Sequence, residues 1–328
     1  MRTSVDSHAP TAERYRVFAE VEARGMSATY EGWALGVAGD PATIRLIDEL
    51  PPAKRQPNLV FGAARLRGAP VGGYGMFRDW LHENWREVRA TAETHATQTN
   101  EAARCALHVP ALAEIPGPLA LLEVGTAAGL CLYPDRYSYR YQGHPQLDPA
   151  GGRSSVVLDC ATAGSVPVPD RLPEVVWRAG IDLNPLDVRD PDDLAWLDAL
   201  IWPEHEDRRE RLRAAAAIVA SDPPRIVAGD LNERLAALAA EAPREATLVV
   251  FHTAVIMYLD EAARARFVDT VQHLPGHWLS AEARTIVPGI RVRDDVPNDS
   301  TDLVLALDGE QLAWAQPHGR ALRWVDTP

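Results

Sequence analysis

The sequence of 328 residues lacks several features that mark familiar classes of protein. It has only three cysteines, Cys105, Cys131 and Cys160, and no C-x-x-C pair, so neither a zinc site nor a redox-active dithiol is indicated. No run of 18 apolar residues occurs, so we expect no membrane span and no membrane partner. Because the polar N-terminal segment also lacks the apolar core of a signal peptide, we expect a cytoplasmic protein.

Basic side chains and known catalytic signatures are also scarce. The 33 Lys and Arg residues against 46 Asp and Glu give a formal net charge of -13, which would repel a phosphate backbone. We therefore expect a small-molecule substrate and no nucleic-acid partner. The chain has no HExxH, GxSxG or Walker motif, and Pro275-Gly276 separates His273 from His277, so no metal site is expected. The oligomeric state is left open.

The sequence predicts two zones that differ in the spacing of their apolar residues. Residues 1–117 have mostly helical spacing of apolar residues, which predicts an all-helical N-terminal domain acting as a lid. This zone includes a long helix from Phe77 to about Val109. In residues 118–328, short apolar runs alternate with helical stretches, as in a parallel sheet that is buried on both faces. We therefore expect an α/β domain after the helical one.

The second zone contains five expected parallel strands, at residues 119–125, 175–182, 225–230, 246–252 and 277–282. Its last three segments, TDLVLALDG, QLAWAQPHG and ALRWV, predict antiparallel strands joined by turns. An insertion of about residues 133–173 separates the first two parallel strands, and its segments YSYRYQG and SSVVLDC suggest a hairpin. The run EHEDRRERLR (204–213) predicts a solvated helix.

The first of these strands runs into a glycine loop, LALLEVGTAAG (119–129). Gly125 lets the chain turn off the strand, and Gly129 lets an expected helix pack closely with its N–H groups toward a ligand. Glu123 supplies a negative charge for a cationic or hydroxylated cofactor. NAD is disfavoured because Ala127 interrupts G-x-G-x-x-G, which leaves S-adenosylmethionine (SAM) as the expected cofactor. An ordinary strand-to-helix turn is the alternative.

Acidic residues end two further strands, and ligands bind outside the carboxyl ends of parallel strands. Asp182 can accept hydrogen bonds from both ribose hydroxyls, or it caps a helix that begins at Asn184-Pro185. Asp159, in the insertion, is a rival for the ribose. Asp230 either accepts from an adenine amino group or caps the next helix.

Two more candidates follow the fourth and fifth strands. His252 is a candidate general base because a histidine pKa lies near neutrality. Its alternative role is structural, with the ring bonded to the backbone. Glu282 is a candidate for contact with a substrate amine, and its alternative is a solvated carboxylate.

Polar clusters outside the strand ends supply candidates for substrate binding. Asn100, Glu101 and Arg104 share one face of the expected long helix, which either lines the pocket or faces solvent. Arg136 and Tyr137 follow the expected glycine-loop helix and either reach the ligand or take part in a local salt bridge.

These motifs resemble two families. EVGTAAG, GIDLNP, AGD, VVFHT and the terminal hairpin, in that order, resemble class I SAM-dependent methyltransferases over about residues 118–328. This resemblance implies a Rossmann-like, seven-stranded methyltransferase-type sheet whose last strand is antiparallel. It also implies a set of cofactor contacts: Gly125, Thr126, Ala127 and Gly129 around the methionine part of SAM, Asp182 at the ribose, Asp230 at the adenine, and His252 beside the methyl group.

Nearly the whole chain also resembles a bacterial family known only as a domain of unknown function. The segments that carry this likeness are RQPNLVFGAARL, TQTNEAARC, LLEVGTAAGL, DRYSYRY, GIDLNPLDVRD, VVFHTAVIMYL and QPHG. It implies that two groups of polar residues face the pocket: Gln98, Asn100, Glu101 and Arg104, and Asp135, Arg136 and Tyr137.

The chain departs from the methyltransferase pattern at three places. Ala127 replaces a commoner glycine, the insertion lengthens the gap before Asp182, and VVFHT differs from the Asn/Asp-Pro-Pro-aromatic motif of amino-group methyltransferases. The predicted function is SAM-dependent methyl transfer to a small-molecule acceptor. The alternative is a methyltransferase-like protein that binds SAM or S-adenosylhomocysteine without methyl transfer, and a nicotinamide oxidoreductase is a third hypothesis.

Overall fold

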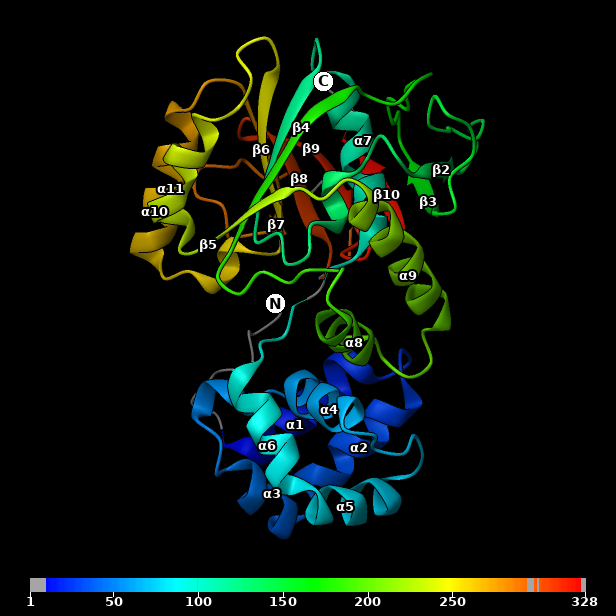
Figure 1. The fold of residues 1–328 in the computed structure, drawn as a ribbon, viewed down its shortest axis with the longest axis vertical. Coiled ribbons are helices and arrows are strands. Elements are labelled where there is room, and N and C mark those ends of the chain that lie inside the picture. Colours follow the sequence, from blue (N-terminus) through cyan, green and yellow to red (C-terminus); the bar gives the residue numbers. More distant parts are fainter. Residues whose placement is uncertain (1–9, 99, 294–297, 300, 326–328) are drawn as a thin grey trace. The chain divides into compact units, whose positions relative to one another are not determined.

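The computed structural model describes residues 10–98, 100–293, 298–299 and 301–325, which divide into two compact units (Figure 1). A sheet unit comprises residues 100–188 and those from 211 onward. A helical unit comprises residues up to 98 and 189–210. The division thus falls near residue 100, whereas the sequence led us to expect it near residue 117, and a later segment of the chain returns to the helical unit.

The helical unit has an aromatic core. Phe61 lies edge-on to Trp33 and Phe77, and the rings of Trp33 and Phe77 stack with centroids 3.9 Å apart. Such packing adds about 1 kcal/mol per ring pair beyond the burial of apolar area. Its helices are α1 (Thr11–Val17) with the π-helical turn η1 (Phe18–Ala23), α2 (Ala28–Ala38), α3 (Pro41–Ile47), η2 (Pro52–Lys54), α4 (Pro57–Leu66), α5 (Tyr74–Glu83), α6 (Trp85–Thr94) and α8 (Pro191–Leu200).

The single long helix expected from Phe77 to Val109 is wrong. The chain leaves α6 at Thr94 and is not helical at residues 95–98 or 100–101, before η3 (Ala102–Arg104) and α7 (Cys105–Ala113). Short polar side chains favour this break because they compete with helical hydrogen bonds. The hydroxyl of Thr97, for example, donates to the side chain of Gln56. Asn100 and Arg104 therefore do not share a helix face.

The five expected parallel strands are confirmed. They are β1 (Leu119–Val124), β4 (Val175–Asp182), β5 (Arg225–Ala228), β6 (Thr247–Thr253) and β7 (His277–Ala283), in the spatial order β5-β4-β1-β6-β7. All four neighbouring pairs are parallel. Strand β1 is buried along its whole length, as an uninterrupted apolar run in a covered sheet requires.

The expected seven-stranded sheet is wrong, because the sheet has ten strands. The terminal strands β8 (Leu303–Leu307), β9 (Glu310–Ala315) and β10 (Ala321–Trp324) pair antiparallel in succession after β7, as predicted. The sheet then continues into β3 (Val157–Ala163) and β2 (Ser138–Tyr141). These two strands pair parallel to each other, so they form no hairpin. The insertion thereby covers an edge of β10 that would otherwise be exposed.

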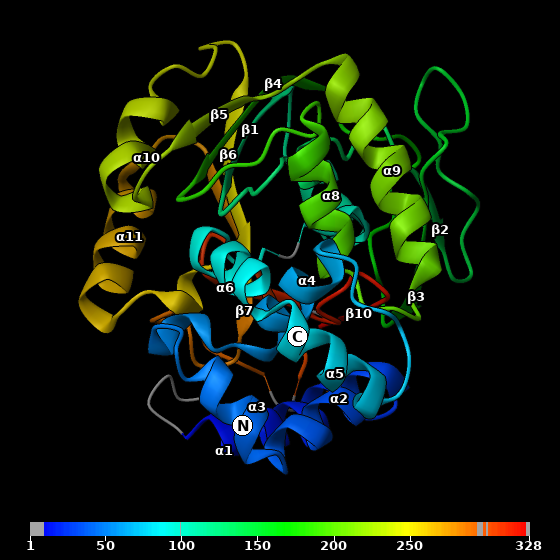
Figure 2. The same ribbon diagram turned by 60° about the horizontal axis from the view of Figure 1, so that its bottom comes forward.

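The two faces of the parallel strands have different coverings. Leu122, Val250 and Trp278 form one core with Phe267 of α11 (Glu261–His273) and Leu235 of α10 (Leu231–Ala239). Figure 2 shows these two helices side by side. Because side chains alternate along a strand, Glu123 and Thr253 belong to the opposite face. His108 of α7 contacts that face, where its ring lies edge-on to Phe251.

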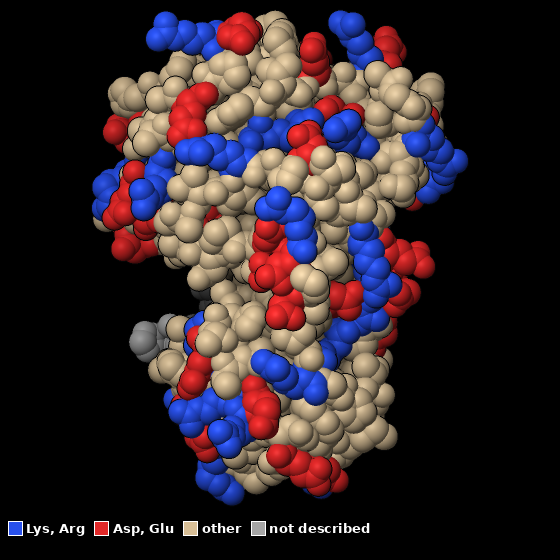
Figure 3. Space-filling view, viewed as in Figure 1, with Lys and Arg blue, Asp and Glu red and all other residues tan. Residues whose placement is uncertain are grey.

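Charges of both signs are mixed on the surface shown in Figure 3. Exposed ion pairs of the protein include Arg89–Glu93 and Arg225–Glu241. In the part of the chain that the structure describes, no helix combines the length and apolar character needed to cross a bilayer.

Candidate functional site

The strand order reverses between β1 and β6. Strands β4 and β5 lie on one side of β1, whereas β6 and β7, which follow them in the sequence, lie on the other side. In open α/β sheets, ligands bind outside the carboxyl ends of the strands at such a switch point. The loops after β1 and β6 are therefore the place where this fold is best suited to hold a ligand.

A buried carboxyl group lies at this switch point. Glu123, near the end of β1, is only 5% exposed, and its Oε2 accepts a hydrogen bond from the Thr126 hydroxyl at 2.7 Å. Burial raises the pKa of Glu123 to about 8, and the hydrogen bond from Thr126 and the charge of Arg104 only partly offset this. The carboxyl group therefore carries its proton at neutral pH.

The loop after β1 has an unusual backbone. Gly125, Ala127 and Gly129 all have positive φ, of 72°, 50° and 77°. A side chain on Gly125 would come within 2.5 Å of the Val255 side chain, so the loops after β1 and β6 are in close contact there. Ala127 in a left-handed conformation costs about 1 kcal/mol, and strain of this kind clusters at functional sites.

The α-helix expected after this loop is wrong. Only the three-residue turn η4 (Leu130–Leu132) follows Gly129. Pro134 prevents a regular helix from continuing, because it has no N–H to donate to the preceding turn. The loop therefore has no helix dipole to direct at a ligand.

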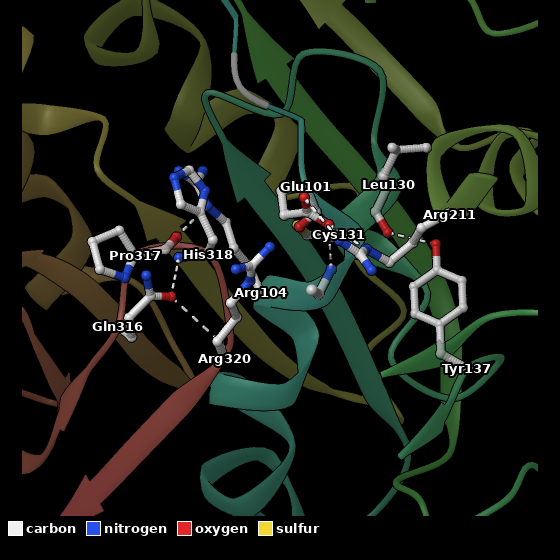
Figure 4. A network of polar contacts seen from close by, with 11 residues as sticks. Glu101, Arg104, Leu130, Cys131, Tyr137, Arg211, Gln316, Pro317, His318 and Arg320 are labelled. Atoms are coloured by element: carbon white, nitrogen blue, oxygen red, sulfur yellow. Dashed lines mark hydrogen bonds and ion pairs between the residues drawn. The ribbon is translucent and has the colours of Figure 1, made fainter. Parts of the chain in front are cut away.

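Tyrosine side chains just before and within β2 support the loop in place of a helix. The Tyr137 hydroxyl donates to the Leu130 carbonyl at 2.7 Å (Figure 4), and the Tyr139 hydroxyl donates to the Pro134 carbonyl at 2.6 Å. Tyr137 is consequently fully buried. Arg136 is exposed and pairs with Asp222, which precedes β5. The structure thus brings neither predicted substrate residue, Arg136 or Tyr137, to the carboxyl ends of the strands.

Most N–H groups of the glycine loop already have partners within the protein. Those of Gly125 and Thr126 donate to the Ile181 carbonyl, that of Ala127 donates to Asp182, and that of Gly129 donates to Thr126. A phosphate cradle depends on several backbone N–H groups that point at the ligand. The loop in this conformation is therefore poorly suited to phosphate.

Asp182 joins the loop to the end of β4. Its Oδ2 accepts from the Ala127 N–H and its Oδ1 accepts from the Asn184 N–H, both at 2.8 Å. The alternative role as a helix cap is wrong, because no helix begins near Asn184 and α8 starts only at Pro191. Its rival Asp159 lies on β3, where it is exposed and paired with Arg140. Five strands of the sheet lie between β3 and β1.

Asp230 lies beside Asp182. The Gly229 N–H donates to the Asp182 carbonyl at 2.9 Å, which holds the end of β5 next to the end of β4. The Asp230 side chain is exposed and caps α10 by accepting from the Asn232 N–H at 2.7 Å. The alternative role as a cap is therefore observed, and an adenine contact stays a prediction.

The non-helical segment before α7 brings Asn100 and Arg104 to the strand ends. The Asn100 amide donates to the Thr126 carbonyl and accepts from the Leu130 N–H, both at 3.2 Å. The half-buried Arg104 donates through Nη1 to the Thr253 carbonyl at 3.2 Å and through Nε to the Pro317 carbonyl at 3.1 Å. One guanidinium group thus connects the end of β6 with the β9–β10 turn. Figure 4 shows Arg104 beside this turn.

Glu101 has a different environment from its neighbours. It is 4% exposed, accepts from the Ala103 N–H, and forms an ion pair of 2.8 Å with Arg211 of α9 (Glu206–Ser221). The predicted helix of residues 204–213 is confirmed in part, but Arg211 is turned toward a buried partner and not toward solvent. This buried ion pair gives Glu101 a structural role that explains its burial without a ligand.

Sequence reasoning missed Thr253 and His108. Their side chains are 3.0 Å apart, from Oγ1 to Nε2, on the same face as Glu123. Burial and the nearby charge of Arg104 lower the pKa of His108 to about 3, so the ring is neutral. Side chains alternate between the two faces along β6, so Thr253 and not His252 shares the face of Glu123. The sequence could have indicated this only if the pairing of β6 with β1 had been known.

His252 and Glu282 lie on the opposite face, under α11. The His252 ring is 0% exposed, its Nε2 accepts from Trp278 Nε1 at 3.0 Å, and its Nδ1 donates to Glu282 Oε1 at 2.8 Å. Glu282 Oε1 also accepts from the N–H groups of Val255 and Ile256. The solvated alternative for Glu282 is wrong. Catalysis by His252 stays a prediction, and both of its nitrogens are engaged in structural hydrogen bonds.

The three cysteines are buried free thiols. Among the residues that the structure describes, no group of three or more His, Cys, Asp or Glu side chains is arranged to hold a metal ion.

Comparison with known proteins gives one match. The model of a family described as "Uncharacterized protein conserved in bacteria (DUF2332)" matches residues 12–324. Neither a search of curated proteins nor a search of solved structures gives a significant match. The expected likeness to a bacterial domain of unknown function is thereby confirmed, and the likeness to methyltransferases stays a prediction.

Proposed function

The chain belongs to this bacterial family, and from that premise we propose that it binds SAM and transfers the methyl group to a small-molecule acceptor. One observation carries the proposal. Glu123, Asp182 and Asp230 lie at the carboxyl ends of three adjacent strands, β1, β4 and β5, beside the switch point. The Asp182 and Asp230 carboxylates suit a ligand that is rich in donors, and SAM offers two ribose hydroxyls, an adenine amino group and an ammonium group.

The same loop argues against a dinucleotide. NAD carries two phosphates, which are usually held at a helix N-terminus by backbone N–H groups. Here η4 is only three residues long, and the N–H groups of Gly125, Thr126, Ala127 and Gly129 have partners inside the protein. SAM has no phosphate and does not need those donors. This contrast favours SAM over a nicotinamide cofactor.

In the proposed complex, Asp182 accepts from the ribose hydroxyls and Asp230 accepts from the adenine amino group. A carboxylate can accept about four hydrogen bonds, so the contacts of Asp182 to the backbone are compatible with a ligand. Glu123 lies beside the methionine end of SAM. Since the sulfonium loses its charge as the methyl leaves, the main contribution of the protein would be to hold the acceptor in line with the methyl–sulfur bond.

Binding without methyl transfer is the second candidate function, and the geometry of His252 favours it. A general base must come within hydrogen-bond reach of the proton that it accepts. His252 is fully buried and bonded to Trp278 and Glu282. If no other residue takes its place, the protein would retain SAM and transfer nothing.

Titration calorimetry tests the binding step. We expect the purified full chain to bind SAM and S-adenosylhomocysteine and not to bind NAD at up to about 1 mM. Asp182→Asn should weaken SAM binding about 10- to 100-fold, because a hydrogen bond to a charged acceptor contributes about 1.5–3 kcal/mol.

Asp159→Asn is the matched control, because it makes the same chemical change at an exposed position of β3, a strand that does not adjoin β1 or β4. It should leave the affinity unchanged. Absence of SAM binding in the unaltered protein, or equal effects of the two substitutions, would contradict the proposal.

A further inference from the structure

The turn between β9 and β10, residues 316–319, is rigidly built. The Gln316 side chain accepts from the His318 N–H at 2.9 Å, and the Gly319 N–H donates to the Gln316 carbonyl at 3.0 Å. These two bonds close the turn on itself and fix the backbone that carries the His318 ring. The sequence shows the segment only as QPHG, a turn after a strand.

Two contacts attach this turn to the segment that precedes α7. Gly319 has a φ of +79°, and a side chain there would lie 2.0 Å from the Ala103 carbonyl oxygen, so only glycine fits. Arg104 donates to the Pro317 carbonyl on the other side of His318. The histidine is therefore flanked by two residues that are anchored to the same short segment.

Arg104 also relates the turn to the switch point. Its second bond, to the Thr253 carbonyl, ends at the last residue of β6. The Pro317 carbonyl therefore lies close to the carboxyl end of β6, because one guanidinium group donates a hydrogen bond to each of them. The side chain of the same Thr253 lies 3.0 Å from His108 Nε2, so Arg104 and His108 meet at one residue of β6.

His318 differs from His252 in the two properties that a proton acceptor needs. Its side chain is half-buried, whereas His252 is completely buried, and it belongs to the turn that Arg104 connects to the end of β6, whereas His252 belongs to the face under α11. Figure 4 shows the His318 ring beside the Arg104 side chain. Among the common side chains, only imidazole has an unperturbed pKa near neutrality.

We infer that His318 is the proton-accepting catalytic residue of this site and that the acceptor carries a hydroxyl or amine group. The inference rests on the proposed function. The lone pair of the acceptor forms the new bond to the methyl carbon, the methyl–sulfur bond breaks, and its electron pair stays on sulfur. The proton that leaves the acceptor oxygen or nitrogen goes to a ring nitrogen of His318, and water later removes it.

Magnetic resonance with SAM that carries a ¹³C-labelled methyl group tests this inference on the full chain. We expect nuclear Overhauser effects between the bound methyl and the ring protons of His318, and none to His252. The ring signals are assigned from His318→Gln and His252→Gln, and from backbone-linked experiments on the unaltered protein if either variant does not fold.

The outcomes separate the two proposals. Methyl contacts to His318 support the inference. If SAM binds by calorimetry but its methyl contacts other residues and not His318, the inference is overturned and the proposed function stands. If SAM does not bind, both are overturned.

Discussion

Glu123 and Glu282 are buried glutamates near the carboxyl ends of parallel strands in one sheet, yet their surroundings differ. Oε1 of Glu282 accepts three hydrogen bonds, from His252, Val255 and Ile256. Glu123 accepts from Thr126, and burial raises its pKa to about 8.

The comparison separates a structural polar cluster from a candidate site. A buried group with several good donors stabilises the fold around it, whereas a group with a strongly perturbed pKa is typical of sites that are arranged for a ligand. Both glutamates are strand-end acids in the sequence, so residue type and position alone do not distinguish them. The donors around Oε1 of Glu282 do, although its Oε2 is buried without a partner among the described residues.

The largest expected effect is the loss of stability when the Glu282 carboxylate is removed. Glu282→Ala leaves the His252 Nδ1–H and the N–H groups of Val255 and Ile256 without their acceptor in a buried region. We expect a loss of about 3–5 kcal/mol in the free energy of unfolding, measured by urea denaturation. It should also disorder the loop after β6, which can be followed by hydrogen exchange.

The matched control is Glu241→Ala, which removes an exposed carboxylate paired with Arg225. A surface pair of this kind contributes no more than about 1 kcal/mol. If Glu282→Ala lowers the free energy of unfolding as little as the control does, Glu282 does not stabilise the fold in the way that we infer.

Much of the sheet could be predicted from the sequence. Continuous apolar runs such as LALLEV are recognisable because a parallel strand buried on both faces needs no polar alternation. The parallel pairing of β2 with β3 could not be predicted, because pairing partners distant in the sequence leave no local signal. The missing helix after Gly129 depends on Pro134 and on Tyr137 and Tyr139, which reach the loop only in the folded chain.

The second effect is the dependence of stability on pH that Glu123 causes. A carboxyl group whose pKa is about 8 when folded and about 4.5 when unfolded stabilises the fold at low pH, and this contribution is lost as pH rises from about 4.5 through about 8. Glu123→Gln stays neutral at every pH. We expect its stability relative to the unaltered protein to rise by about 2–3 kcal/mol between pH 6 and pH 8, measured by urea denaturation.

Glu310→Gln makes the same substitution at an exposed position of β9 and should follow the unaltered protein at each pH. Parallel curves for Glu123→Gln and the unaltered protein would show that Glu123 is ionised at neutral pH. The contrast with Glu282 would then fail.

The candidate site was predicted less well than the sheet, for a physical reason. The carboxyl-end rule placed Glu123 and Asp182 at the ends of neighbouring strands, because it depends only on strand direction. It could not say on which face a side chain lies. His252 and Thr253 are adjacent and therefore point to opposite faces, so an error of one residue exchanges a buried structural ring for a residue of the Glu123 face.

The smallest expected effect tests what holds the glycine loop. Tyr137→Phe removes the hydroxyl that donates to the Leu130 carbonyl and keeps the buried ring. We expect a loss of about 1 kcal/mol in stability and faster hydrogen exchange at residues 125–132, since one neutral hydrogen bond contributes about that much. Tyr258→Phe is the control, because that side chain is 81% exposed. Unchanged exchange in Tyr137→Phe would mean that the loop keeps its shape without β2, and the insertion would then serve only the edge of the sheet.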